Sequence, residues 1–223
     1  MFDLLRTVNL ETAALSQNQQ RLLDYRDETL FSGTLSHQTA RTYLISARAF
    51  LRWLDESALR IDQIDYRVIE RYRIHLTITP IKSAYGGRKR SPSTIYAVLR
   101  AVKHLMKWLL TMGDIKKNPF DRVSLRRPAD KMMIPLKIWE LRQLIKAAKS
   151  HGLTPVERAR NYALITLISD LGLRVRSEAL AINLADVQRN GRMSSEFLVS
   201  AKGANRLVPL APVPAQAIEE YLP

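Results

Sequence analysis

Two cationic side chains in the second half of the chain are placed where they suit work on a phosphate group. Arg174 follows a Gly172-Leu173 break between two apolar helical runs, and Lys202 lies in the turn of a short hairpin. An arginine offers a planar fork that matches two phosphate oxygens, and it stays charged at any working pH. A lysine on a hairpin can reach a leaving-group oxygen as a general acid. Together they suit neutralisation of the charge that grows on a phosphate during phosphoryl transfer.

Apolar runs on both sides of Arg174 predict the elements that hold these two cations. Residues 162–168 are apolar nearly all round, which indicates a buried helix before the break. Residues 197–199 and 207–210 are β-type runs and predict two short strands. The residues Gly203, Ala204 and Asn205 between them predict a three-residue hairpin turn.

The first half of the chain reads as helical, and one of its helices is signalled by apolar residues at helical spacing over 43–54. Ser36 or Thr39 is expected to cap its start. The opposite side of this helix carries three arginines: Arg41, Arg48 and Arg52. Arg41 and Arg48 are candidates for DNA contact, with a merely solvated helix face as the competing interpretation.

A second amphipathic helix starts at Ser91-Pro92, a capping residue followed by proline at the first helical position, and is expected to end at Gly113. Its outer face carries three candidate DNA-binding cations: Arg100, Lys103 and Lys107. The glycine-containing loop before this helix adds three more: Arg88, Lys89 and Arg90. We expect this loop to become ordered on a nucleic-acid backbone.

The balance of charge favours a nucleic-acid partner. The 223 residues carry 35 Lys and Arg against 21 Asp and Glu, a net charge of +14, and no acidic residue occurs between Glu70 and Asp114. One-signed clustering of this kind is typical of nucleic-acid binding, with ribosome or anionic-membrane association as alternatives. Tyr85 and Tyr96 are the only stacking aromatics near the cluster, which argues against single-stranded RNA. We therefore expect double-stranded DNA as the partner.

The composition excludes several other classes of protein. The chain has no cysteine, so it has neither disulfides nor thiolate metal sites, which fits a cytoplasmic location. No apolar run approaches about 20 residues, so no membrane span is expected. Residues 1–6 include an early acid and do not read as a signal peptide. We expect neither a metal ion nor another cofactor.

Shifts in composition divide the chain into two blocks. Asn118-Pro119 ends the helical block, and residues 126–135 read as an extended basic linker. The second block opens with a helix over 137–149 and ends with a further helix over 214–222. The expected organisation is a helical DNA-binding domain of residues 1–120, a linker of residues 121–135 and a second domain of residues 136–223.

In this order, the segments resemble the tyrosine recombinases, also called phage-type integrases. Residues 91–119 are similar to the last helix of the family's core-binding domain, and residues 135–144 to the first helix of its catalytic domain. Residues 172–180 resemble the box with the first catalytic arginine, and residues 201–210 the hairpin with the catalytic lysine. The resemblance covers residues 15–223. It implies a mainly α fold, in which an all-helical, SAM-like core-binding domain precedes a partial α+β catalytic domain with a short β-hairpin.

The resemblance implies site-specific DNA integration and recombination, in which strands are cut and rejoined without ATP or metal. It gives Arg174 the binding of the scissile phosphate, Lys202 the protonation of the departing 5′ oxygen, and Glu178 the orientation of the arginine. The family usually has two residues between the arginine and the acid, and this chain has three. Arg176 is therefore the rival for the phosphate-binding position. The family assembles as tetramers on DNA, so a homo-oligomer is a further expectation.

The later part of the family's machinery is not found in these 223 residues. The His-x-x-Arg motif and the nucleophilic tyrosine of the family follow the hairpin, whereas all four histidines here precede Arg174. Tyr221 follows the hairpin too closely to be taken as the nucleophile. The resemblance therefore implies a recombinase truncated before the second half of its catalytic domain and inactive alone. A non-catalytic duplex-DNA-binding protein or regulator is the alternative.

Overall fold

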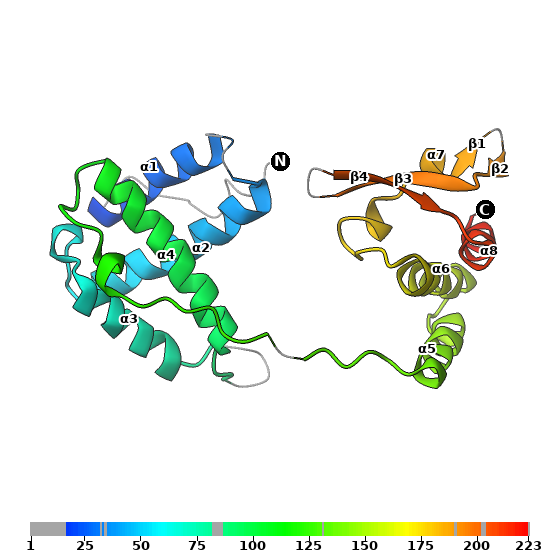
Figure 1. The fold of residues 1–223 in the computed structure, drawn as a ribbon, viewed down its shortest axis with the longest axis horizontal. Helices are drawn as coiled ribbons and strands as arrows, with labels where there is room; N and C mark the ends of the chain where they lie inside the picture. Colours follow the sequence, from blue (N-terminus) through cyan, green and yellow to red (C-terminus); the bar gives the residue numbers. More distant parts are fainter. Residues whose placement is uncertain are drawn as a thin grey trace. The chain divides into compact units, whose positions relative to one another are not determined.

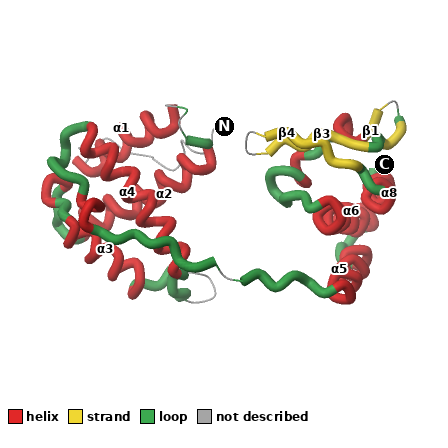
Figure 2. The backbone as a smooth tube through the Cα atoms, viewed as in Figure 1, coloured by secondary structure: helices red, strands yellow, loops and turns green. Residues whose placement is uncertain are grey.

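The structure, a computed structural model, describes residues 17–31, 33, 35–81, 87–130, 132–189, 191–201 and 204–222. The chain divides into unit 1 (Met1–Lys131) and unit 2 (Met132–Pro223), and each unit has its own hydrophobic core. The described part of unit 1 is helical, and the strands that pair into small sheets belong to unit 2 (Figure 2). The predicted mainly α fold with a short β-hairpin is therefore confirmed.

Unit 1 is built from helices (Figure 1). They are α1 (Gln17–Phe31), α2 (His37–Glu56), η1 (Ile61–Gln63), α3 (Tyr66–Ile78), α4 (Pro92–Thr111) and η2 (Pro119–Arg122), where η denotes a 3-10 helix. Ser36 caps α2 by accepting the amide of Thr39, and Ser91 caps α4 by accepting the amide of Thr94. Gly113, with a φ of 79°, follows the last turn of α4. The predicted caps of both helices are thus present.

The core of unit 1 forms where the apolar stripes of α2, α3 and α4 meet. Each of these helices contributes fully buried side chains, among them Phe50, Leu54, Ile69, Tyr72, Val102 and Leu105. The stripes that predicted α2 and α4 are therefore the surfaces that pack. Phe120 and Val123 join the same core, so the packing of unit 1 continues past residue 120 and through η2.

The end of α3 is closed by a side chain from the segment before α4. Nη1 of Arg90 donates to the carbonyl oxygen of Thr79 at 2.6 Å and to that of Leu76 at 3.4 Å. The last carbonyl groups of a helix have no partner within the helix, so a guanidinium there satisfies them and the negative end of the helix dipole. Arg90 is accordingly half-buried, whereas Arg88 and Lys89 are exposed.

Unit 2 packs its helices beneath a β-hairpin. Its elements are α5 (Ile138–Ser150), α6 (Pro155–Leu171), η3 (Ala179–Ala181), α7 (Leu184–Val187), β1 (Gln188–Arg189), β2 (Arg192–Met193), β3 (Glu196–Ala201), β4 (Ala204–Pro209) and α8 (Pro212–Tyr221). Helix α6 packs against both α5 and α8. The β3–β4 hairpin lies over α6 and α8 (Figure 1). Its inner face brings Phe197, Val199 and Val208 into a core with Leu167 of α6 and Ile218 of α8.

The hairpin turn differs from the predicted one. Strands β3 and β4 are antiparallel, with Ala201 opposite Ala204 and Ser200 opposite Asn205. Ala204 and Asn205 therefore belong to β4, and the three-residue turn predicted for them was wrong. Each further pair in the ladder satisfies backbone N–H and C=O groups that a wider turn leaves to solvent. Lys202 and the glycine after it lie outside the described residues.

Apolar side chains also lie on the outside of unit 2. Leu198 and Leu207 face each other across the hairpin, on the side opposite the core, and are 54% and 61% exposed. In the extended segment before α5, Met132, Met133 and Ile134 are almost fully exposed. None of the described helices, however, is long and apolar enough to cross a membrane.

We expect Arg90→Ala to destabilise unit 1 by about 1 kcal/mol, because the carbonyl oxygens at the end of α3 lose their charged donor. Urea unfolding followed through the NMR signals of α3 measures this change. Lys89→Ala removes a neighbouring exposed cation and is the matched control, with an expected change within about 0.5 kcal/mol. Equal stability of the two variants would contradict the role given to Arg90.

Candidate functional site

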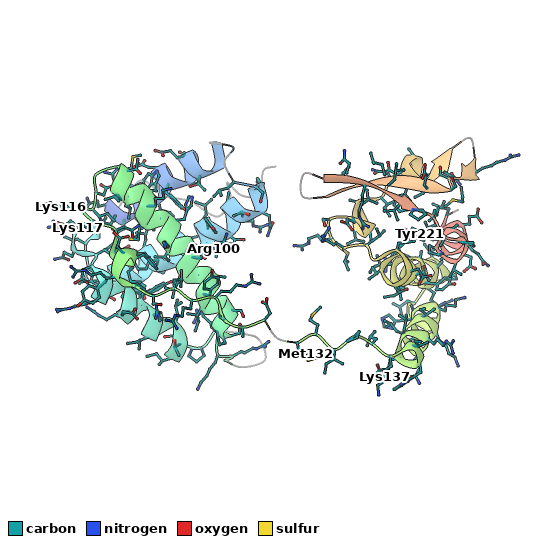
Figure 3. The ribbon with its side chains drawn as sticks, in the orientation of Figure 1. Arg100, Lys116, Lys117, Met132, Lys137 and Tyr221 are labelled. Atoms are coloured by element: carbon teal, nitrogen blue, oxygen red, sulfur yellow. The ribbon has the colours of Figure 1, made fainter. Side chains whose placement is uncertain are left out.

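The predicted basic face of α4 is exposed. Arg100 (labelled in Figure 3), Lys103 and Lys107 are all exposed, and spacings of three and four residues put them on one side of the helix. His104 lies at the edge of this face and ties α4 to α1, because its Nδ1 lies 2.8 Å from the hydroxyl of the buried Tyr25 on α1. Burial, and after it the neighbouring Lys107, lowers the pKa of His104. The imidazole is therefore neutral near pH 7, and the lysines and the arginine supply the charge of this face.

Helix α2 carries the second predicted set of cations. Arg41, Arg48 and Arg52 are exposed, and their spacing puts them on one line along the helix. Helix α2 packs beside α4, and the ring of Tyr43 lies 5.1 Å from that of His104 where the two helices meet. Two neighbouring helices of unit 1 therefore present basic side chains to solvent.

The three candidate cations of the loop before α4 do not share one environment. Arg88 and Lys89 are exposed, and the backbone of Arg88 pairs with that of Ile81. Arg90 donates to the end of α3, as described above. Residues 82–86, the rest of this loop, lie outside the described residues. Arg88 and Lys89 therefore present exposed charges, while the guanidinium of Arg90 is engaged within unit 1.

Gly172 and Leu173 bring Arg174 to the surface of unit 2. Helix α6 ends at Leu171, and Gly172 adopts the left-handed backbone conformation, with a φ of 62°, that glycine favours. Leu173 then enters the core, and Arg174 emerges with 59% of its side chain exposed. The amide of Glu178 donates to the carbonyl oxygen of Arg174 at 3.0 Å and closes a turn of the backbone. We call residues 174–178 the arginine turn.

Glu178 is buried, and arginine groups surround its carboxylate. The side chain is 1% exposed; Oε1 accepts from Nη1 of Arg174 at 2.6 Å, and Oε2 accepts from the backbone N–H of Arg174 at 2.9 Å. That backbone N–H, and after it the side chains of Arg206 and Arg174, holds the pKa of Glu178 below its usual range, although burial acts in the opposite direction. An ionised Glu178 thus fixes the orientation of Arg174.

Arg206 of β4 binds the same carboxylate and was not among the predicted site residues. Its Nη2 lies 3.0 Å from Oε2 of Glu178. Because side chains alternate along a strand, Arg206 shares the inner side of β4 with the buried Val208, and the buried Leu210 continues this side just after the strand. This alternation was the available sequence signal, since it places a cation at an inward position. The contact brings the hairpin and the arginine turn together within unit 2.

Of the two remaining predicted residues of this site, the structure describes Arg176 but not Lys202. Arg176 is exposed on the arginine turn and has no ion-pair partner among the described residues. Lys202 lies between the described ends of β3 and β4, outside the described residues. In the part of the chain that the structure describes, no group of three His, Asp or Glu side chains is placed to hold a metal ion.

We expect Glu178→Gln to destabilise unit 2 at pH 7, because a neutral amide replaces a carboxylate that accepts from two arginines. The lowered pKa of Glu178 means that its contribution is present above the unfolded pKa, about 4.3, and is lost as the pH falls through the lower folded value. The stability difference between the two chains should therefore shrink below about pH 4. Urea unfolding followed through the NMR signals of β3 measures it.

Glu219→Gln is the matched control, because Glu219 is an exposed glutamate of unit 2. This change should alter the free energy of unfolding by no more than about 0.5 kcal/mol, both at pH 7 and below about pH 4. A pH-independent effect of Glu178→Gln would show that packing, rather than the charge of Glu178, supports the arginine turn.

Three comparisons with known proteins agree with this arrangement. Residues 21–126 match the phage integrase SAM-like domain. The chain is 24% identical over 188 residues to tyrosine recombinase XerC of Pediococcus pentosaceus, which is 83% of this chain and 58% of the relative. It is 27% identical over 208 residues to tyrosine recombinase XerC 2 of Ralstonia nicotianae, which is 91% of this chain and 56% of the relative. The chain thus spans little more than half the length of these relatives.

The fold is similar to that of the Tn1549 transposon integrase, whose structure was solved in complex with circular intermediate DNA. The TM-score is 0.55 at 18% identity, over 89% of this chain and 63% of the integrase chain. The SAM-like match falls within unit 1, and the alignments with the XerC relatives are longer than either unit. By these matches, and by the order of its helical unit, arginine turn and hairpin, the chain is similar to the tyrosine recombinases over most of its length.

Proposed function

We propose that this chain binds double-stranded DNA and holds one backbone phosphodiester during site-specific strand exchange by a tyrosine recombinase. The observation that carries the proposal is the buried carboxylate of Glu178, which fixes the exposed guanidinium of Arg174 beside the hairpin of Lys202. The XerC relatives, which are tyrosine recombinases by name, and the integrase solved on DNA support this assignment. A DNA substrate and a chain without cysteine fit a cytoplasmic location.

In this proposal Arg174 binds the non-bridging oxygens of the scissile phosphate. A tyrosine hydroxyl gives up its proton to water and forms the new bond to phosphorus as the bond to the 5′ oxygen breaks, and Lys202 gives a proton to the departing oxygen. The guanidinium of Arg174 stays charged and stabilises the negative charge that develops on the phosphate. The ion pair with Glu178 supports Arg174, rather than Arg176, as the phosphate-binding residue.

Unit 1 supplies DNA contacts that do not depend on base sequence. Exposed cations at helical spacing can follow a phosphate backbone and displace its counterions. The exposed candidates on α4, on α2 and in the loop before α4 are Arg100, Lys103, Lys107, Arg41, Arg48, Arg88 and Lys89. We leave Arg90 out of this set, because its guanidinium already donates to the end of α3.

Strand cleavage needs groups beyond those in this polypeptide. The 223 residues contain no His-x-x-Arg motif. Tyr221 is the last residue of α8 (labelled in Figure 3), and we assign it no part in cleavage. We therefore propose that the polypeptide binds DNA but does not cut it by itself. The tetrameric assembly that strand exchange implies is part of the same proposal.

A non-catalytic DNA-binding regulator is the second candidate function. Unit 1 has a hydrophobic core of its own and presents exposed cations from α2 and α4. Binding through unit 1 therefore needs no chemistry in unit 2. The two candidate functions differ in what they require of Glu178. A recombinase needs Arg174 held in place by this buried carboxylate, whereas a non-catalytic DNA-binding protein does not.

We expect duplex binding to weaken steeply with salt, and Lys103→Gln with Lys107→Gln to make the slope of log K against log salt shallower by about 2. Lys116→Gln with Lys117→Gln is the matched control, because these exposed lysines lie beyond the end of α4, at the edge of unit 1 in Figure 3. Fluorescence anisotropy between about 50 and 200 mM salt measures both slopes. Equal loss in the two double variants would mean that the face of α4 has no special part in DNA binding.

We also expect that a nicked suicide substrate traps no covalent protein–DNA adduct with the 223-residue polypeptide. Denaturing gel electrophoresis detects such an adduct, and a full-length XerC relative with its own site serves as the positive control. An adduct that disappears in Tyr221→Phe would make Tyr221 the nucleophile and refute the proposed lack of cleavage.

A further inference from the structure

Two arginines and one carboxylate leave a net positive charge at the surface of unit 2. Glu178 contributes one negative charge, and Arg174 and Arg206 contribute two positive ones. The side chain of Glu178 is 1% exposed, whereas those of Arg174 and Arg206 are 59% and 48% exposed. The neutralising group therefore lies inside the protein, and the excess charge faces solvent.

Both guanidinium groups keep donors for a further ligand. Each has five N–H donors in a planar fork. Within the described residues, Glu178 engages Nη1 of Arg174 and Nη2 of Arg206. The other N–H groups belong to side chains that are about half exposed. An anion can therefore approach two forks at the same time.

The shared carboxylate also brings the two cations together. Arg174 comes from the turn after α6, and Arg206 comes from β4. Their mutual repulsion is offset because each pairs with a different oxygen of Glu178, Oε1 for Arg174 and Oε2 for Arg206. The guanidinium groups are thus held side by side. A phosphodiester has two non-bridging oxygens, so each guanidinium can bind one of them.

We propose that Arg206 is a second ligand of the phosphodiester that Arg174 binds, with Glu178 as their shared support. This inference rests on the proposed function and adds a residue of the hairpin to its phosphate site. Arg206 lies on the same hairpin as Lys202, so a phosphate bound to Arg206 is held on the hairpin that delivers the leaving-group proton.

Side-chain NMR of the 223-residue chain tests this without DNA and without cleavage. The Nε–H signals of Arg174 and Arg206 are assigned by through-bond correlations to the backbone resonances of the same residues. Dimethyl phosphate, which is an isolated phosphodiester, is then titrated into the sample at constant ionic strength. We expect both signals to shift with one apparent Kd. Arg206→Lys keeps the charge but loses the fork. It should weaken the response of Arg174 about two- to fivefold, the range for an exposed charge pair.

Arg176→Gln is the matched control, because it removes an exposed arginine of the same turn; it should leave the Kd unchanged. A shift of Arg174 with Arg206 unmoved would overturn the inference and leave Arg206 as a support for Glu178. A lack of response in both signals would overturn it as well. The titration of the unaltered chain decides between these outcomes even if Arg206→Lys does not fold.

Duplex binding measured on the same sample separates this inference from the proposed function. A duplex that binds while dimethyl phosphate moves neither signal refutes the phosphodiester site and leaves DNA binding standing. A joint shift of both arginines in a chain that binds no duplex refutes the proposed function and leaves the anion site standing.

Discussion

The burial of one negative charge organises unit 2. A carboxylate inside a protein is unfavourable unless donors surround it, and Glu178 is surrounded by the backbone N–H of Arg174 and by two guanidinium groups. This requirement fixes the path of the chain. Gly172 must turn the backbone sharply after α6, Leu173 must anchor it in the core, and β4 must bring Arg206 within reach. The positions of the exposed guanidinium groups of Arg174 and Arg206 are therefore set by the buried carboxylate of Glu178 that they pair with.

Unit 1 meets a different constraint, since one helix must serve both a core and a charged surface. Helix α4 places Val102 and Leu105 against α2 and α3, while its other face presents cations. His104 lies between these two faces, and its contact with Tyr25 ties α4 to α1. Because the ring of His104 is neutral near pH 7, unit 1 avoids a further positive charge beside Lys107. The positive charge of this face of α4 therefore comes from exposed side chains that do not pack in the core.

Local signals in the sequence predicted local structure well, and contacts between distant segments remained hidden. Ser36 and Ser91 cap their helices as expected, because a cap depends on residues within one turn. The part of Arg90 at the end of α3 and the pairing of Arg206 with Glu178 depend on chain paths that periodicity does not encode. The hairpin turn was misplaced because Asn205, a common turn residue, also fits an extended strand. The alternation of side chains along β4 was a signal for Arg206 that the prediction did not use.

The outward leucines of the hairpin set a practical limit on handling the protein. Leu198 and Leu207 form a small exposed apolar patch on the outer face of the hairpin, and exposed apolar patches favour association between copies of a protein at high concentration. The net charge of +14 keeps copies apart only while the ionic strength is low. High salt therefore has two opposing effects during purification. It releases contaminating nucleic acid from the protein, but it also screens the electrostatic repulsion between copies of the protein. Exchanging the pair for lysine and glutamate resolves the conflict, since a cross-strand ion pair there leaves the inner side of the hairpin untouched.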